Sequence, residues 1–229
     1  MLMLEQLNIV QGDFGLRADW SVPAGTRVAI IGPSGGGKST LLGAISGFVE
    51  ASGRVLWANA RLDGLAPGKR PIAMLFQDQN LFPHLTAAQN VGLALSQKRL
   101  TEAERSRVEN ALVRVGLEGL NNRKPAQLSG GQQSRVALAR LLLQDRPLWL
   151  LDEPFAALGP GLRSEMLALV HQIAEEVGAT VLMVTHDPED ARRFAQAIVM
   201  VDQGIAQAPR PTGQVFANPD AALRDYLGL

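Results

Sequence analysis

The chain has 229 residues, of which 46% are apolar, with 23 glycines and 13 prolines, an ordinary composition for a folded protein of one large or two small domains. Its 22 Lys and Arg balance its 22 Asp and Glu, so no global charge attracts nucleic acid or anionic lipid. The absence of cysteine excludes disulfides and thiolate metal sites, and no run of roughly 18 apolar residues predicts a membrane-spanning helix.

The first 79 residues favour strands around a single helix. Strand patterns occupy residues 2–10, 26–31 and 53–58, and a helix begins at Lys38 and continues toward Gly47. A polar turn precedes another buried strand at 72–76, which ends at Gln77.

The periodicity then changes. Residues 80–145 follow a helical pattern, and Thr101 with Glu104 predicts a capping box at one helix start. From 146 onward, strands at 148–151, 180–184 and 198–201 alternate with helices at about 161–177 and 188–196, and only short elements follow Gly204. This alternation predicts an α/β fold with a mostly parallel sheet core. We expect one domain, 1–229, in which a helical subdomain of about 80–145 is inserted between core segments 1–79 and 146–229.

Residues 32–40 fit the phosphate-binding pattern G-x-x-x-x-G-K-[ST] directly after a buried strand. Glycines let backbone N–H groups close around phosphate oxygens, Lys38 supplies a charge to the β- and γ-phosphates, and Ser39 can bind Mg²⁺. The alternative is an ordinary Gly-rich turn. The pattern predicts ATP binding by Gly32, Pro33, Ser34, Gly35, Gly36, Gly37, Lys38, Ser39 and Thr40.

Two carboxylates, Asp152 and Glu153, follow the apolar strand 148–151. Unpaired carboxylates are costly at a buried strand end, and a metal ion with a reactive water removes that cost. We expect Asp152 to hold Mg²⁺ and Glu153, pointing the other way along the strand, to polarise the water that attacks the γ-phosphate. The alternative is an acidic helix cap before Pro154.

A second candidate anion site precedes the amphipathic stretch 133–144. Because the chain has one Lys-bearing phosphate loop, the economical interpretation is that this second site faces ATP held by another copy, in a homodimer. The alternative is a Gly-rich cap of a solvent-facing helix. The residues concerned are Ser129, Gly130, Gly131 and Gln132.

These segments, together with Gln77 and His186, resemble in order and spacing the ATP-binding subunits of ABC transporters, over the whole chain. The resemblance implies the P-loop NTPase fold of ABC ATPases, with an N-terminal antiparallel β subdomain. It implies that Gln77 senses Mg²⁺ and the attacking water, and that His186 contacts the γ-phosphate. The expected catalytic residues are then Glu153, His186 and Lys38. Without this context, Gln77 is a polar strand end and His186 a helix cap.

Residues 74–95 and the short ending are most similar to the ATPases of Gram-negative thiamine importers, which the chain resembles in having no C-terminal regulatory domain. This implies uptake of thiamine or its phosphates, at the cytoplasmic face of the inner membrane, with a periplasmic solute-binding protein acting indirectly and no nucleic acid. A permease is expected to dock near 78–95, at Leu81, Phe82 and Leu85, or these side chains fill the subdomain core. The alternatives are another solute (a polyamine, iron, sulfate or a sugar), an ABC-type ATPase acting on nucleic acid, and a small-molecule kinase.

The sequence departs from the family pattern twice. Gly159 replaces the acidic residue that crosses to the neighbouring phosphate loop, which puts communication between two ATP sites in doubt. Gln11 stands where an aromatic side chain usually stacks on adenine, although Phe14 is close by.

Overall fold

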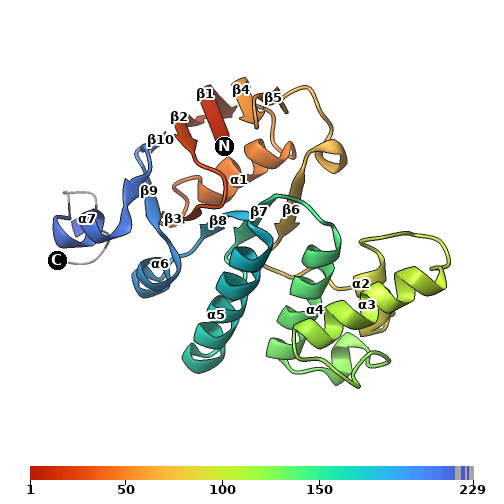
Figure 1. The fold of residues 1–229 in the computed structure, drawn as a ribbon. Helices are drawn as coiled ribbons and strands as arrows, with labels where there is room; N and C mark the ends of the chain where they lie inside the picture. Colours follow the sequence, from red (N-terminus) through yellow and green to blue (C-terminus); the bar gives the residue numbers. More distant parts are fainter. Residues whose placement is uncertain (220–222, 225, 227–229) are drawn as a thin grey trace.

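The computed structural model describes residues 1–219, 223, 224 and 226, in which one mixed sheet runs through the molecule (Figure 1). The strand order is β5-β4-β1-β2-β10-β9-β3-β8-β7-β6, and β11 pairs with β9. The strands are β1 (Leu2–Gln11), β2 (Phe14–Val22), β3 (Arg27–Ile31), β4 (Ser52–Trp57), β5 (Ala60–Arg61), β6 (Ile72–Leu75), β7 (Leu148–Asp152), β8 (Thr180–Val184), β9 (Ala197–Asp202), β10 (Ile205–Ala206) and β11 (Arg210–Pro211).

The half formed by β9, β3, β8, β7 and β6 is entirely parallel, as the alternation of strands and helices predicts. Its strands are buried on both faces, which explains their continuous apolar runs. In register, Leu75 lies beside Leu151, and Asp152 lies beside Val184. The carboxyl ends of these strands therefore meet at one edge, where β3 also ends and the phosphate loop begins.

The other half is mainly antiparallel, and its longest strand that the sequence analysis did not predict is β2. β1 pairs with β2 and with β4, while the two-residue strand β10 runs antiparallel to β9 and parallel to β2, which joins the halves. In β2 buried and exposed residues alternate, with Leu16, Ala18 and Trp20 inside. The charged residues between them make the apolar content of this segment low, so the period-2 pattern was overlooked.

The helices are α1 (Lys38–Ser46), α2 (Ala87–Gly92), α3 (Glu102–Arg114), α4 (Gly130–Leu143), α5 (Pro160–Val177), α6 (Pro188–Phe194) and α7 (Thr212–Ala217), with 3-10 turns at Pro67–Lys69 and Pro125–Gln127. The predicted capping box of Thr101 and Glu104 is present at the start of α3. No described helix is long and apolar enough to cross a bilayer.

Alternate residues of β3 separate two cores. Val28 and Ile30 belong to a cluster with Leu41, Leu42 and Ile45 of α1, all fully buried, and with side chains of the antiparallel strands. The next residues along β3 face the opposite side, where α4, α5 and α6 pack. Helix α1, which carries the phosphate loop at its start, is thus held between the two halves of the sheet (Figure 1).

Candidate functional site

The phosphate loop is shaped by glycines that no other residue could replace. Gly32 has φ +146°, and a Cβ there would lie 2.0 Å from the carbonyl oxygen of Val201. At Gly37, which is the N-cap of α1 and has φ +97°, a Cβ would lie 2.4 Å from Cζ of Phe14. An L side chain would clash at both positions in addition to straining the backbone. The loop is therefore a fixed turn between β3 and the start of α1.

Lys38 lies over this loop. Its Nζ donates to the carbonyl oxygens of Gly32 (2.9 Å) and Pro33 (2.8 Å), and the residue is only 7% exposed. Burial lowers the pKa of Lys38, while Glu153 and Asp152 act in the opposite direction. The ammonium group is thus held against the loop by two of the loop's carbonyl groups.

Ser39 and Asp152, separated by 113 residues in sequence, are in contact. The Ser39 hydroxyl donates to Oδ1 of Asp152 over 2.8 Å. Burial raises the pKa of Asp152, although the Ser39 bond opposes this and Lys38 lowers it further. A hydroxyl and a carboxylate oxygen at hydrogen-bonding distance form the hard-oxygen donor set that Mg²⁺ prefers.

Glu153 and Asp152 have different hydrogen-bond partners, as expected, but strand alternation is not the cause. β7 ends at Asp152, and Glu153 has φ +42°, a left-handed conformation that is rare outside glycine and asparagine. Its backbone N–H donates to Val184 and its Oε2 lies 2.8 Å from Nδ1 of His186. The turn at Glu153, rather than strand alternation, directs the two carboxylates to different partners.

Gln77 is exposed two residues beyond β6, at the same sheet edge as Glu153. The segment that follows it is tied to α4 by contacts that the sequence did not indicate. Arg140 donates to the carbonyl oxygens of Gln79 (2.6 Å) and Asn80 (2.7 Å), and Nε2 of Gln79 lies 2.6 Å from Oγ of Ser134. The end of β6 and helix α4 are therefore mechanically connected.

Ser129, Gly130, Gly131 and Gln132 begin α4. Ser129 Oγ accepts from the Gln132 N–H, and the Gln132 side chain accepts from the Ser129 N–H, which forms a capping box. A Cβ at Gly131 would lie 2.4 Å from Leu162 of α5, so this turn packs against the core. Within the described residues no hydrogen bond or ion pair joins this turn to the phosphate loop.

Phe14 lies at the phosphate loop, whereas Gln11, its partner across the β1–β2 hairpin, is exposed. The ring of Phe14 packs so closely on Gly37 that it occupies the space a side chain would need there. Of the two residues considered for base stacking, Phe14 is thus the one whose ring reaches the loop.

The opposite end of α1 is closed by an arginine that the sequence analysis also missed. Arg70, only 5% exposed, donates from Nη1 to the carbonyl oxygens of Ala44 (3.1 Å) and Ile45 (2.7 Å), and from Nε to Leu65 (3.0 Å). A cation at a helix C-terminus complements its dipole. Arg70 lies 25 residues from Ile45, and no local pattern announces such a contact.

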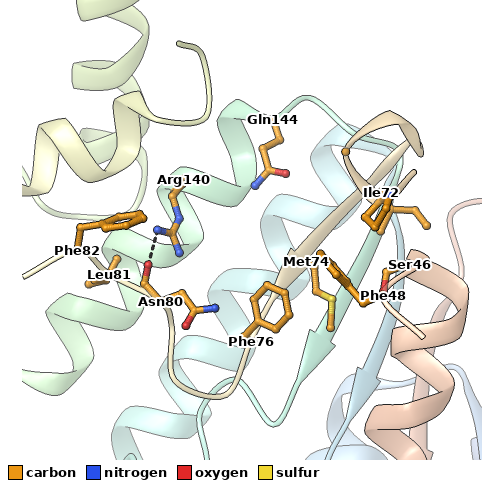
Figure 2. Close-up of a pocket in the computed structure, with 12 residues that line it drawn as sticks. Ser46, Phe48, Ile72, Met74, Phe76, Asn80, Leu81, Phe82, Arg140 and Gln144 are labelled. Atoms are coloured by element: carbon orange, nitrogen blue, oxygen red, sulfur yellow. Dashed lines mark hydrogen bonds between the residues drawn. The ribbon is translucent and has the colours of Figure 1, made fainter. Parts of the chain in front are cut away.

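A groove of about 560 Å³ lies beside α1, between β6, the segment after it and α4 (Figure 2). Phe48 and Phe82 are 62% and 47% exposed at this groove, and the ring of Phe48 meets that of Phe76 edge-on at 5.8 Å. Arg140 provides a polar wall by its bond to Asn80, drawn in Figure 2. Leu81 and Phe82 line this groove, whereas Leu85, expected with them, lines a separate cavity next to α2 and α3. The complete lining is Ser46, Phe48, Pro67, Gly68, Ile72, Met74, Phe76, Asn80, Leu81, Phe82, Arg140 and Gln144.

Comparison with known proteins agrees with this geometry. Residues 16–156 match the family model described as ABC transporter. The chain is 62% identical to the thiamine import ATP-binding protein ThiQ of Cereibacter sphaeroides, over the full length of both chains. It is 56% identical to the protein of the same name from Ruegeria sp., again over both full lengths.

Solved structures give the same result. The dimeric ATP-binding cassette MJ0796, in a post-hydrolysis state bound to ADP and Pi, is 33% identical, with a TM-score of 0.79 and coverage of 93% of this chain and 99% of that one. CbiO1 of Clostridium perfringens, part of an ABC transporter complex, is 32% identical with a TM-score of 0.83, covering 95% and 90% of the two chains.

Proposed function

Because this chain belongs to the ABC transporter family, we propose that it is the ATP-binding and ATP-hydrolysing subunit of an importer that takes up thiamine or thiamine phosphates. The convergence of Lys38, Ser39 and Asp152 on one sheet edge carries the proposal of ATP chemistry. The full-length identity of 62% to a named thiamine import protein supports the choice of solute.

ATP binds at the start of α1. The N–H groups of the phosphate loop surround the β- and γ-phosphates, and Lys38 exchanges its bonds to Gly32 and Pro33 for phosphate oxygens. Phe14 lies against the adenine. Ser39, Asp152 and the exposed side chain of Gln77 are the groups that would hold Mg²⁺, which neutralises developing phosphate charge when bound.

Glu153 acts on the attacking water. Its carboxylate accepts a proton or orients the water, while the bond from Nδ1 of His186 fixes its second oxygen. As an imidazolium, His186 would donate from Nδ1 to Glu153 and from Nε2 to the γ-phosphate. Lys38 stabilises the charge that develops on the transferred group.

Two copies form the working unit, a homodimer with head-to-tail-facing sites. Ser129 and the N–H groups of Gly130 and Gly131 at the start of α4 contact the γ-phosphate held by the other copy. The ordered capping box leaves this turn preformed for that contact. Dimer closure excludes water from both sites.

The groove of Figure 2 receives a helix of the membrane permease. Exposed aromatic side chains in an open groove suit the apolar face of an amphipathic helix. Because one wall of the groove is α4 and Arg140 links it to the segment after Gln77, motion of the docked helix would be coupled to the start of α4. The chain is then a peripheral protein at the cytoplasmic face of the inner membrane. In this arrangement residues 1–229 act as one ATPase domain, and about 80–145 form the helical subdomain.

Glu153→Gln tests the catalytic assignment. It should keep ATP binding, lower steady-state ATP hydrolysis by at least about 100-fold, and accumulate an ATP-dependent dimer in size-exclusion chromatography. Gln lacks the negative charge but keeps the shape and the contact to His186. Hydrolysis at the wild-type rate would remove Glu153 from the reaction.

The groove is tested with Phe48→Ser combined with Phe82→Ser. This variant should keep basal ATP hydrolysis and lose stimulation by, and co-purification with, the cognate permease. Val10→Ser is the matched control, because Val10 is 64% exposed on β1 and does not line the groove. Equal stimulation of the groove variant and the control would place the docking site elsewhere.

Uptake of labelled thiamine by cells with and without the gene tests the solute.

A further inference from the structure

The C-terminal segment reaches back to the reactive edge of the sheet. Tyr226, the only tyrosine of the chain, donates its phenol hydrogen to the backbone carbonyl oxygen of His186 over 2.7 Å. The side chain of the same His186 contacts Glu153 at 2.8 Å. A residue close to the end of the sequence is therefore one contact away from the group assigned to the attacking water.

The region around this contact is already ordered by charge. Arg163 of α5 pairs with Asp187 (3.2 Å) and with Asp190 (3.5 Å), and Asp187 caps α6 by accepting from the Glu189 N–H. These contacts hold the residues after His186. Tyr226 acts on the peptide of His186 itself, which is the point from which the imidazole extends.

The segment that carries Tyr226 is anchored at the far end of α6. The buried Thr212 donates from its hydroxyl to the carbonyl oxygen of Ala195 over 2.7 Å. Arg192 of α6 lies over the ring of Phe216 of α7, 5.9 Å from its centroid. The chain after β11 is thus connected to α6 near its C-terminus through Thr212 and to the residue before its N-cap through Tyr226.

From this geometry, and resting on the ATPase function proposed above, we propose that Tyr226 is a positioning residue for ATP hydrolysis, which holds the His186 peptide so that the imidazole stays on Glu153. Burial and the nearby carboxylates of Asp187 and Glu153 raise the pKa of Tyr226 to about 12, so the phenol remains a hydrogen-bond donor. Without this bond the His186 peptide can rotate, and the imidazole spends less time where it fixes Glu153.

Tyr226→Phe is the decisive variant, because it keeps the ring and removes only the donor. ATP hydrolysis by the full chain should fall in kcat by roughly three- to tenfold, the range expected from the loss of one positioning hydrogen bond, with KM changed less than about twofold. In a His186→Ala background the same substitution should have no further effect, since its route of action is gone. Gln214→Ala, an exposed change on α7, is the matched control and should behave as wild type.

A direct readout does not depend on activity. The chain has three histidines, so the imidazole NMR signals of His84, His171 and His186 can be followed separately. Tyr226→Phe should shift the signal of His186 and leave the other two in place. An unshifted His186 signal, or an unchanged kcat, overturns the proposal, as does an equal loss in the His186→Ala background. A wild-type chain that neither binds nor hydrolyses ATP would instead refute the proposed function, while the NMR comparison still tests the contact.

Discussion

Replacing Arg70 by Met tests whether the far end of α1 is held by a buried cation. The change leaves the carbonyl oxygen of Ile45 and that of Leu65 without this donor, while Ala44 keeps a bond from the Gly47 N–H. The buried carbonyl group of Ile45 left without a partner costs about 1 to 3 kcal/mol, whereas Leu65 is 40% exposed and water can replace its donor. Relieving the guanidinium group of its desolvation returns part of this, because burial also lowers the pKa of Arg70. We therefore expect a net loss of about 1 to 2 kcal/mol in the free energy of unfolding.

Thermal unfolding followed by circular dichroism measures this loss. For a chain of this length the expected decrease in Tm is about 3 to 6 °C. Arg70→Lys is the matched variant, because it keeps the charge but cannot donate to the carbonyl groups of both Ile45 and Leu65 as the guanidinium does. Its decrease in Tm should be roughly half that of Arg70→Met. A Tm of Arg70→Met within about 2 °C of wild type would refute the reasoning, as would equal losses in the two variants.

Three further predictions concern the reactive edge and its neighbours. Burial raises the pKa of Asp152, so the stability that its protonated form contributes at low pH is lost as the pH rises through that pKa. Asp152→Asn should therefore raise the Tm of the ligand-free chain at neutral pH and abolish the additional rise in Tm that Mg²⁺ with ATP produces. A lower Tm of the ligand-free variant would contradict this. Gly159 is the N-cap of α5 and makes no side-chain hydrogen bond, and a Cβ added there meets nothing within 4 Å. Gly159→Asp should therefore stabilise the chain by a few tenths of a kcal/mol in urea unfolding. No gain in stability would show that the Asp side chain does not cap α5. At about pH 10.5 a free phenol would be roughly three-quarters ionised, whereas Tyr226, with its pKa raised to about 12 by burial and the carboxylates of Asp187 and Glu153, should show almost no tyrosinate absorbance while the chain stays folded. Absorbance near the free value would show that the ring is not buried beside these carboxylates in solution.

Most of the parallel core could be predicted because each strand is a short apolar run closed by a turn. The strand at 148–151 and the helix at 161–177 differ from β7 and α5 by a single residue at one end. The phosphate loop and the pair Asp152 and Glu153 were found by local patterns in which each residue type answers a chemical demand. The fold class and the family expected from these patterns are confirmed.

Contacts between distant segments could not be predicted. Arg140, Arg70 and Tyr226 donate to backbone carbonyl groups 61, 25 and 40 residues away, and a carbonyl group carries no sequence signal. The left-handed turn at Glu153 is similarly hidden, because the identity of the residue favours an ordinary conformation and the surrounding packing imposes another. The sequence analysis also grouped Leu85 with Leu81 and Phe82, whereas Leu85 lines a different cavity. The path of the chain after Phe82 decides which cavity each side chain lines, and no local sequence pattern gives this path.

The burial of α1 between two layers of strands links nucleotide capture to the integrity of the whole molecule. Residues 41–46 of α1 are all buried, so we expect the exchange of their amide protons with solvent to require one of the larger unfolding events of the chain. Heating should then leave the helix behind the phosphate cradle folded until the chain as a whole melts. The cradle is consequently a rigid reference, and the adjustments needed during a transport cycle fall to the parts that surround it.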